Sequence, residues 1–213
     1  MKHLFTYGPV SLEEVENVPL KETEIGMVPD EWPLLKLKDI FKITSGKTRP
    51  KQFKSIASDV FIYPIYGGNG IMGYSEKSLI DFPTIIIGRV GAYCGSVYVS
   101  KSKSWISDNA LYARDFRFKK IDLNYLATAL KLLNLNRLKN QGGQPLISQS
   151  IVYSQFVPIP TLPVQQKIAS ILSAVDRKIE AEQTKKKALD DLFKTLLNIL
   201  MTGKLRVNHL EVK

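Results

Sequence analysis

The longest regular pattern of hydrophobic positions lies near the end of the chain. From Pro163 to Met201 there is no internal Pro or Gly, and apolar residues recur at alternating spacings of four and three. This is the a/d spacing of a heptad repeat, which predicts a long coiled-coil helix. Pro163 suits the first turn of a helix and Gly203 suits its end. At about 1.5 Å per residue the helix is a rod of roughly 57 Å, and we assign residues 162–203 to it and 204–213 to a tail.

The a and d positions of this helix form the seam of the expected coiled coil, and the centre of the seam is charged. Eight of its ten a and d positions are apolar, and Glu182 and Lys186 lie side by side in the middle. In an antiparallel pair with a two-fold axis near residue 184, Glu182 of each copy faces Lys186 of the other, which would fix register. We therefore expect a homodimer that uses Ile168, Leu172, Val175, Ile179, Glu182, Lys186, Leu189, Phe193, Leu196 and Leu200. Two alternatives stay open: packing of the helix on its own domain, with 185–187 a solvated face, and pairing with a different chain.

The middle of the chain has the pattern of a small β-rich domain. Short β-rich runs alternate with turn signals, at 61–66, 84–87, 96–100 and 110–118. Asp122 precedes a stretch with helical periodicity that ends near Asn136, and 148–153 suits a further short helix. The expected fold class is α+β: a mixed, mostly antiparallel β domain over 31–161, followed by the long C-terminal helix in an antiparallel coiled coil.

The first thirty residues have a different character. They are acidic, with 2 Lys+Arg against 6 Asp+Glu, and they contain three prolines. We interpret 1–30 as an extended arm or linker with a short helix at 11–16 and little contribution to the core.

The net charge of +10 is concentrated in the middle domain. Residues 31–161 hold 18 Lys+Arg against 8 Asp+Glu, and seven basic residues fall between Lys36 and Lys54 with Asp39 as the only acid. Such clustering is typical of a surface that contacts phosphates. The competing interpretation is a solvated face without a partner.

Catalytic and metal-binding patterns are not found. Cys94 is the single cysteine, and His3 and His209 lie at the two ends, so the sequence predicts neither a disulfide nor a zinc site. The run 45–48 ends like a P-loop, but Phe41 stands where the loop needs its first glycine. Neither an aminomethyltransferase motif nor a well-placed nuclease carboxylate pair occurs, so we expect a non-enzymatic chain without its own cofactor. The absence of an apolar leader or span favours the cytoplasm.

Three segments carry a family resemblance. The run Val157–Ile168, VPIPTLPVQQKI, followed by Ile171-Leu172 and Val175–Ile179, is similar to the junction of recognition domain and conserved helix in type I restriction-modification specificity (S) subunits. Residues 200–207, LMTGKLRV, resemble the end of that helix, and 23–32, TEIGMVPDEW, resemble the lead-in to a recognition domain. Val164 departs from the family, which often has Glu there, and a capping-box carboxylate is thereby missing.

The resemblance implies a half-length S subunit. Family members usually have two target-recognition domains and two long helices that read a bipartite, interrupted DNA sequence, whereas this chain has one of each. A homodimer would read an interrupted palindrome in double-stranded DNA. The family's S subunit is not catalytic; it docks modification (M) subunits, which use S-adenosylmethionine, and restriction (R) subunits, which cleave. Leu192, Leu197 and Ile199 are candidates for that docking. The alternative function is a coiled-coil adaptor or regulator that binds nucleic acid without a methyltransferase partner.

The candidates for DNA contact are chosen from side-chain chemistry alone. Long polar or aromatic side chains beside glycines can approach base edges, and lysines and arginines in a loop can contact phosphates. The phosphate candidates are Lys47, Arg49, Lys51 and Lys54, and the base-edge candidates are Tyr66, Asn69, Arg89, Tyr93, Gln141 and Gln144. Trp105, Tyr112 and Phe116 lie in strand patterns, and we expect them in the core.

Overall fold

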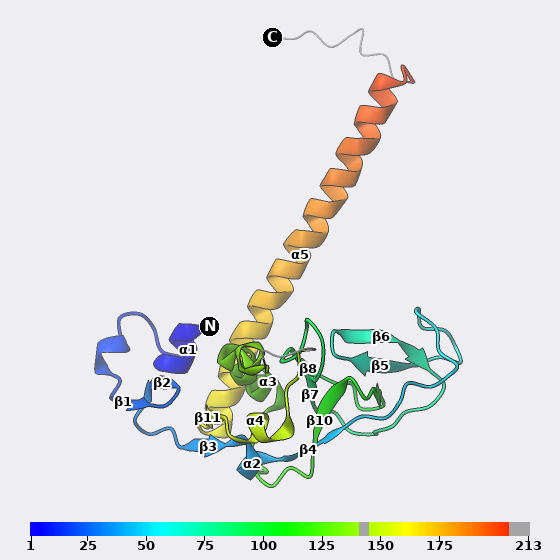
Figure 1. Ribbon diagram of the computed structural model, residues 1–213. Helices are drawn as coiled ribbons and strands as arrows, with labels where there is room; N and C mark the ends of the chain where they lie inside the picture. The colour runs from blue at the N-terminus through cyan, green and yellow to red at the C-terminus, as the bar shows by residue number, and fades with distance from the viewer. Residues whose placement is uncertain (141–144, 205–213) are drawn as a thin grey trace, which may run out of the picture. The chain divides into compact units, whose positions relative to one another are not determined.

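The computed structural model describes residues 1–140 and 145–204 (Figure 1). Two compact units are distinguished within it. The first comprises Met1–Ala169, and the second begins at Ser170. Helix α5 (Leu162–Met201) starts in the first unit and continues into the second, and it ends two residues before the predicted end at 203.

A four-stranded antiparallel sheet is the centre of the first unit. Its strand order is β4 (Lys42–Ser45), β10 (Ala110–Arg114), β7 (Ile85–Gly88) and β8 (Val97–Val99). All four residues of β7 are buried, as expected for an inner strand with a continuous apolar run. Helix α3 (Leu123–Leu133) packs against β7 and β8. Asp122 caps the start of α3 by accepting a hydrogen bond from the Tyr125 N–H at 2.8 Å.

A three-stranded sheet lies beside it. Strands β5 (Tyr63–Gly67) and β6 (Gly70–Ser75) form an antiparallel hairpin, and β9 (Trp105–Ile106) pairs with β5 in parallel. The runs predicted at 61–66, 84–87, 96–100 and 110–118 correspond to β5, β7, β8 and β10 (Figure 1). The predicted α+β class is confirmed.

Two short two-stranded sheets and several short helices complete the first unit. β11 (Phe156–Pro158) pairs with β3 (Leu34–Lys36), and β1 (Leu20–Thr23) pairs with β2 (Gly26–Pro29). The short helices are α1 (Lys2–Thr6), η1 (Val15–Asn17), α2 (Leu37–Ile40), η2 (Leu135–Leu138) and α4 (Gln149–Tyr153).

The expectation that residues 1–30 add little to the core is wrong. Phe5 is 5 % exposed and stacks on Tyr125 with ring centroids 5.3 Å apart, and Val28 is 2 % exposed. The segment forms a helical turn at Lys2–Thr6, a 3-10 turn at Val15–Asn17 and the β1–β2 hairpin, so the helix expected over 11–16 is replaced by the 3-10 turn. These elements are too short to show a period, so composition alone suggested a linker.

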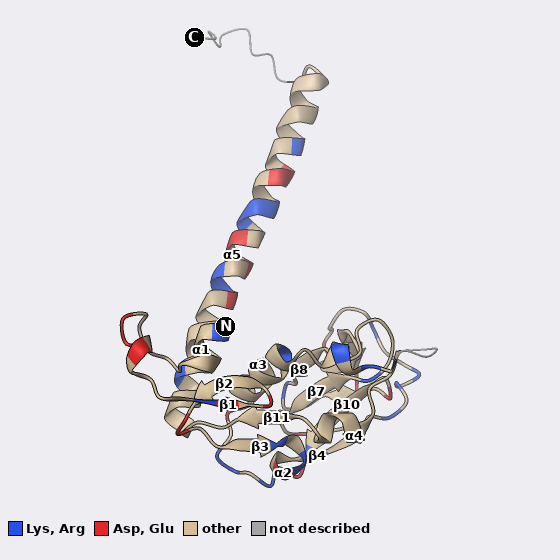
Figure 2. Cartoon of the chain, turned by 60° about the vertical axis from the view of Figure 1, so that its left-hand side comes forward, with Lys and Arg blue, Asp and Glu red and all other residues tan. Residues whose placement is uncertain are grey.

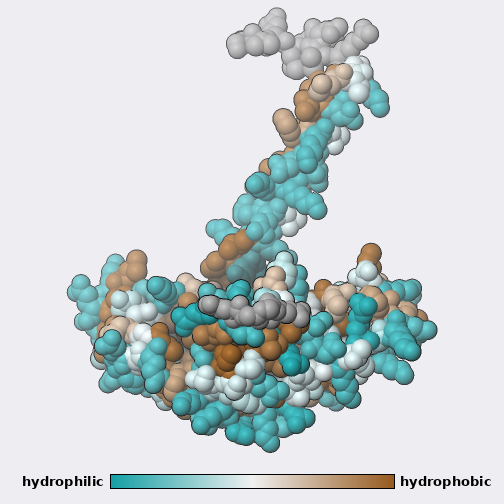
Figure 3. All heavy atoms as spheres, in the orientation of Figure 1, coloured by the Kyte–Doolittle hydropathy of each residue, from teal (hydrophilic) through white to brown (hydrophobic). Residues whose placement is uncertain are grey.

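The apolar seam of α5 is exposed along the second unit. Val175 and Ile179 are each 49 % exposed and Phe193 is 65 % exposed. Brown apolar side chains are visible along this part of the helix in Figure 3. Across residues 1–140 and 145–204, none of the helices is long and apolar enough to span a bilayer.

Candidate nucleic-acid interface

One end of the central sheet gathers the ends of three strands. β10 is antiparallel to both neighbours, with Ala110 opposite Gly88 and Leu111 opposite Ser45, so β4 and β7 end where β10 begins. Two backbone hydrogen bonds join the connecting turns: Gly46 N–H donates to Ala110 C=O at 3.1 Å, and Arg89 N–H donates to Asn109 C=O at 2.9 Å. We call the turns at this end, residues 45–47, 67–70, 88–93 and 107–110, the reading edge.

Arg89 is held in place within the reading edge. Its Nη1 donates to Ser45 Oγ at 3.1 Å, and its backbone carbonyl accepts from the Ile147 N–H at 2.9 Å. The side chain is half-buried. A guanidinium fixed in this way loses less side-chain entropy when it binds, which suits an arginine that reads a base or phosphate.

The β5–β6 turn adds a hollow to the same edge. A pocket of about 500 Å³ is lined by Asn69, Tyr93 and Asn109, together with the glycines of both turns. The turns approach so closely that a Cβ on Gly88 would lie 2.6 Å from the Gly68 carbonyl oxygen, so only glycine fits there. Tyr93 is 55 % exposed, an unusual position for a large aromatic side chain. The structure therefore brings three of the base-edge candidates, Asn69, Arg89 and Tyr93, to one place.

The four basic candidates lie on the loop that leaves this edge after β4. Lys47, Arg49, Lys51 and Lys54 are all exposed. The Arg49 guanidinium lies 3.9 Å from the centroid of the Phe53 ring, and Lys54 Nζ lies 5.2 Å from that of Phe61. These cation–π contacts hold the Arg49 and Lys54 side chains against aromatic rings of the loop. Both side chains stay exposed and can contact a polyanion. Figure 2 shows the Lys and Arg positions in blue.

Two ends of the basic loop are fixed to the sheets. Lys47 N–H donates to Ile106 C=O at 3.0 Å, and Lys54 exchanges backbone hydrogen bonds with Tyr74 of β6 at 3.0 and 2.7 Å. Lys51 lies between these anchors and lines a hollow of about 350 Å³ with Trp105 and Lys77. The loop therefore presents its cations from a positioned backbone.

Tyr66 does not belong to this surface. Its side chain is 5 % exposed in a cluster with Ile86 and Ile106, and its hydroxyl accepts from the Lys101 N–H at 3.3 Å. Burial raises the pKa of this hydroxyl. The sequence placed Tyr66 beside glycines correctly, but β5 is the central strand of its sheet and residues 64–67 are all buried, so side chains on both of its faces are covered. Gln141 and Gln144 lie outside the described residues.

The expected core aromatics are only partly buried. Tyr112 packs against the Tyr66 cluster, and Phe116 meets Phe41 edge to face with ring centroids 5.7 Å apart. Trp105 is also half-buried, and its Nε1 donates to the Lys47 carbonyl at 3.4 Å.

Sequence reasoning missed Ser45 and Asn109. Asn109 lines the pocket, and Ser45 positions Arg89. The turn signal Ser107-Asp108-Asn109 between two strands was the available clue to Asn109, whereas nothing local to Ser45 indicated that residue 89 would lie against it.

The predicted dimerisation residues divide between the two units. Ile168 is fully buried in the core of the first unit, so it cannot form part of an exposed seam. Leu172 is half-buried, and from Val175 onward the apolar seam is exposed. Glu182 and Lys186 line a shallow apolar hollow of about 440 Å³ together with Val175 and Ile179. Among the docking candidates Leu192 and Leu197 are 53 and 45 % exposed, and Ile199 is half-buried.

Comparison with known proteins points to one family. The model of the type I restriction modification DNA specificity domain matches residues 29–191. The specificity subunit of the type I restriction enzyme MjaVIII from Methanocaldococcus jannaschii is 26 % identical over 99 % of this chain and 53 % of its own length. That of EcoprrI from Escherichia coli is 30 % identical over 54 % of this chain and 28 % of its own length.

Solved structures agree on the fold. The crystal structure of a type I restriction-modification S subunit from M. genitalium has a TM-score of 0.63 at 21 % identity, covering 79 % of this chain and 45 % of that one. The chain thus spans about half the length of the relatives it matches. Since the family model matches well over half of its residues, this chain belongs to the type I restriction-modification DNA specificity domain family.

Proposed function

We propose that the chain is a non-catalytic, sequence-specific DNA-binding subunit of a type I restriction-modification system. The observation that carries this proposal is the reading edge, where Asn69 and the exposed Tyr93 line one hollow and Arg89, anchored by Ser45, lies in the same turn as Tyr93. Arginine and asparagine side chains are the common bidentate readers of guanine and adenine edges. Family membership supports the same function.

The basic loop, residues 47–54, contacts the DNA backbone. Lys47, Arg49, Lys51 and Lys54 contact phosphates and set the position of the reading edge, while Asn69, Arg89, Tyr93 and Asn109 contact base pairs. This division fits the two parts that specific DNA interfaces need, because phosphate contacts position a protein and base contacts specify the sequence. Gln141 and Gln144 remain part of the proposal as further base-edge candidates.

Two copies of the chain pair as a homodimer through their long helices. An antiparallel pair of α5 helices covers the exposed apolar seam, and the Glu182–Lys186 layer sets the axis. The two recognition domains then lie at opposite ends of a helical spacer. Because they are identical, the target is an interrupted palindrome with one half-site for each copy.

Partner subunits supply the chemistry. We assign S-adenosylmethionine to an M subunit and cleavage to an R subunit, in the cytoplasm, and Leu192, Leu197 and Ile199 to their docking. The exposure of the first two beside the seam supports this assignment.

The test is reconstitution with a type I modification (M) subunit. The complex methylates a randomised DNA library, and sequencing of modified sites reads the target directly. We expect a bipartite motif with inverted half-sites. A continuous motif, or two unrelated half-sites, would contradict the homodimer, and methylation that is independent of the chain would contradict the specificity function. A chain that binds DNA but neither forms a complex with a methyltransferase subunit nor directs its methylation would favour the adaptor.

A further inference from the structure

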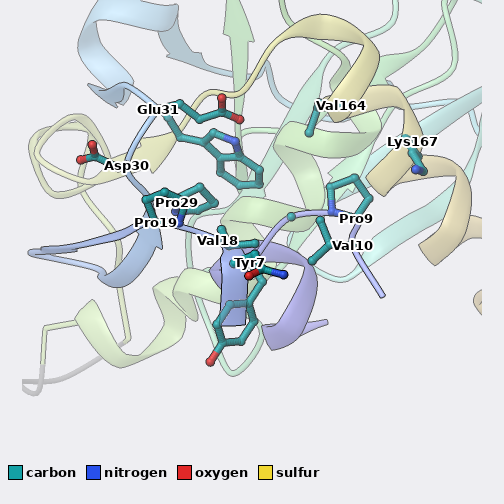
Figure 4. Close-up of a pocket in the computed structure, with 13 residues that line it drawn as sticks. Tyr7, Pro9, Val10, Val18, Pro19, Pro29, Asp30, Glu31, Val164 and Lys167 are labelled. Carbon is teal, nitrogen blue, oxygen red and sulfur yellow. The ribbon is translucent and has the colours of Figure 1, made fainter. Parts of the chain in front are cut away.

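Two hollows of the first unit differ in charge. One, of about 550 Å³, lies between residues 7–32 and the start of α5, and its lining includes the carboxylates of Asp30 and Glu31 as well as Lys167 (Figure 4). An excess of carboxylates does not suit DNA, whose phosphates are negative. The other is the hollow of about 500 Å³ in the reading edge, and none of the described residues that line it carries a charge. The hollow of the reading edge is therefore the one that suits a base pair.

Apolar side chains are exposed around this hollow. Ile71 is 45 % exposed and Met72 is 39 % exposed, and both belong to the lining together with the exposed ring of Tyr93. A cluster of exposed apolar side chains on a soluble protein marks a contact surface more often than a single one does. The surface that these side chains form beside Asn69 is therefore suited to an apolar group of a ligand.

A β-bulge brings Ile71 and Met72 to the same hollow. Ile71 of β6 lies opposite Tyr66 of β5, and Gly73 lies opposite Ile65, so Met72 is an extra residue without a partner in the register. Successive side chains of a regular strand point to opposite faces, whereas a bulge changes the direction of a side chain. Both side chains are exposed here, and the hairpin presents them as a pair.

This pair lies between the turn of the hairpin and the basic loop. A Cβ on Gly67 would lie 3.1 Å from Sδ of Met72, so the thioether lies against the end of β5, next to the turn that carries Asn69. A Cβ on Gly73 would lie 2.8 Å from the carbonyl oxygen of Lys54, so the other end of the bulge packs directly on the basic loop. Contacts to phosphates and contacts to a base pair are thus adjacent on one surface.

The side chains of the hollow match one kind of base pair. In the major groove an A·T pair presents N6 and N7 of adenine, which pair with an asparagine amide, and the methyl group of thymine, which apolar side chains contact. A G·C pair has no methyl group, and its edges suit arginine, lysine, aspartate and glutamate, which the described lining of the hollow lacks.

The hairpin also has a shape that fits the major groove. β9 pairs only with Ile65 and Tyr66 of β5, so at its turn the hairpin has two strands. A two-stranded ribbon is one of the elements that the major groove admits. Asn69 lies at the tip of this ribbon, and the bulge follows it in β6.

We infer that the hollow of the reading edge binds an A·T base pair, with the Asn69 amide on the N6 and N7 edge of adenine and the Ile71 and Met72 side chains against the thymine methyl group. This inference rests on the DNA-reading function proposed above and names the base pair that this edge selects. The thymine methyl group is then a determinant of specificity, and the bulge in β6 is the feature of the fold that reads it.

Deoxyuridine tests the methyl contact, because it differs from thymidine only by the absence of this methyl group. The chain is reconstituted with an M subunit, and selection from a randomised duplex library gives the bound sequence. Each thymine of that sequence is then replaced by uracil in turn, and fluorescence anisotropy measures the affinity. We expect binding about fourfold weaker at one thymine position, the loss that corresponds to one buried methyl-sized group.

Variants of the bulge assign this loss to its residues. Ile71→Ala with Met72→Ala should bind the thymine and uracil duplexes equally, whereas Leu12→Ala, which truncates an aliphatic side chain that is 81 % exposed and outside the lining, should keep the fourfold difference. Met72→Gln keeps the length of the side chain and should reduce the difference even if the double variant does not fold. A full uracil penalty in the folded double variant would overturn the methyl contact.

The adenine contact is tested on the same base pair. 7-Deazaadenine lacks the N7 acceptor, and in place of the adenine opposite the sensitive thymine it should weaken binding of the wild type by about fivefold. Asn69→Ala should bind both duplexes equally. Sensitivity to 7-deazaadenine at a different base pair from the uracil sensitivity would overturn the assignment of both contacts to one pair.

The library separates this inference from the proposed function. If the reconstituted chain enriches no sequence, both are overturned. If it enriches a sequence in which no thymine is sensitive to loss of its methyl group, the A·T assignment is overturned and the DNA-reading function stands.

Discussion

The side-chain oxygen of Gln165 accepts a hydrogen bond from the backbone N–H of Asp122 at 2.9 Å. Asp122 is the N-cap of α3, and Gln165 lies in the first turn of α5. The amide nitrogen of Gln165 donates to the Lys120 and Pro160 carbonyls at 3.1 and 2.9 Å, and the side chain is fully buried. One amide thus joins the start of the long helix to the recognition domain.

Removal of this amide should destabilise the first unit. Gln165→Ala leaves one backbone donor and two carbonyls without a partner, which costs about 2 kcal/mol or more. Differential scanning calorimetry should show a melting temperature lower by roughly 4–8 °C. The neighbouring exposed Gln166→Ala is the matched control and should leave the melting temperature unchanged. An unchanged value for Gln165→Ala would mean that water replaces the lost bonds.

The sequence predicted the long helices better than it predicted which residues and elements contact one another in space. Periodicity located α3 and α5 closely because long helices repeat their burial pattern every 3.6 or 3.5 residues. β9, of two residues, and the hairpin β1–β2 were missed, since such short elements depend on tertiary pairing rather than on a repeat. The hydrogen bond between Ser45 and Arg89 joins positions 44 residues apart, so no local sequence pattern indicates it. Ile168 has perfect heptad spacing, yet it is buried by its own domain, because a heptad shows which face is apolar and not what covers it.

Phosphate contact by the basic loop predicts a change in salt dependence. Lys51→Ala should weaken binding to all DNA sequences alike and reduce the slope of log K against log salt by about one. Fluorescence anisotropy over a salt series measures both quantities. Lys119→Ala, an exposed lysine beyond the opposite end of β10 from the reading edge, is the control and should keep the wild-type slope. The assignment fails if the two variants have the same slope.

Base contact by Asn69 predicts a loss of discrimination. Asn69→Ala removes an exposed side chain from the β5–β6 turn, so stability should change little. Binding to the cognate site should fall by about 1–3 kcal/mol, whereas binding to unrelated DNA should stay the same. Competition with a set of single-base variants identifies the base pair that is no longer discriminated. A uniform loss across all sequences would instead place Asn69 at the DNA backbone.

The central Glu182–Lys186 layer of the helix predicts that one charge reversal weakens the dimer and that a second, compensating reversal restores it. Glu182→Lys places four lysine side chains around the proposed axis, and like charges there should weaken the dimer by about tenfold. Adding Lys186→Glu in the same chain restores opposite charges across the axis and returns the original net charge, so the double variant should dimerise like the wild type. Analytical ultracentrifugation of the three proteins at low and high salt checks this, with the difference shrinking at high salt because exposed charges are screened. Lys187→Glu together with Glu180→Lys makes the same exchange off the seam and should have no effect on the mass. A single variant that stays as dimeric as the wild type would remove the charged layer as the determinant of register.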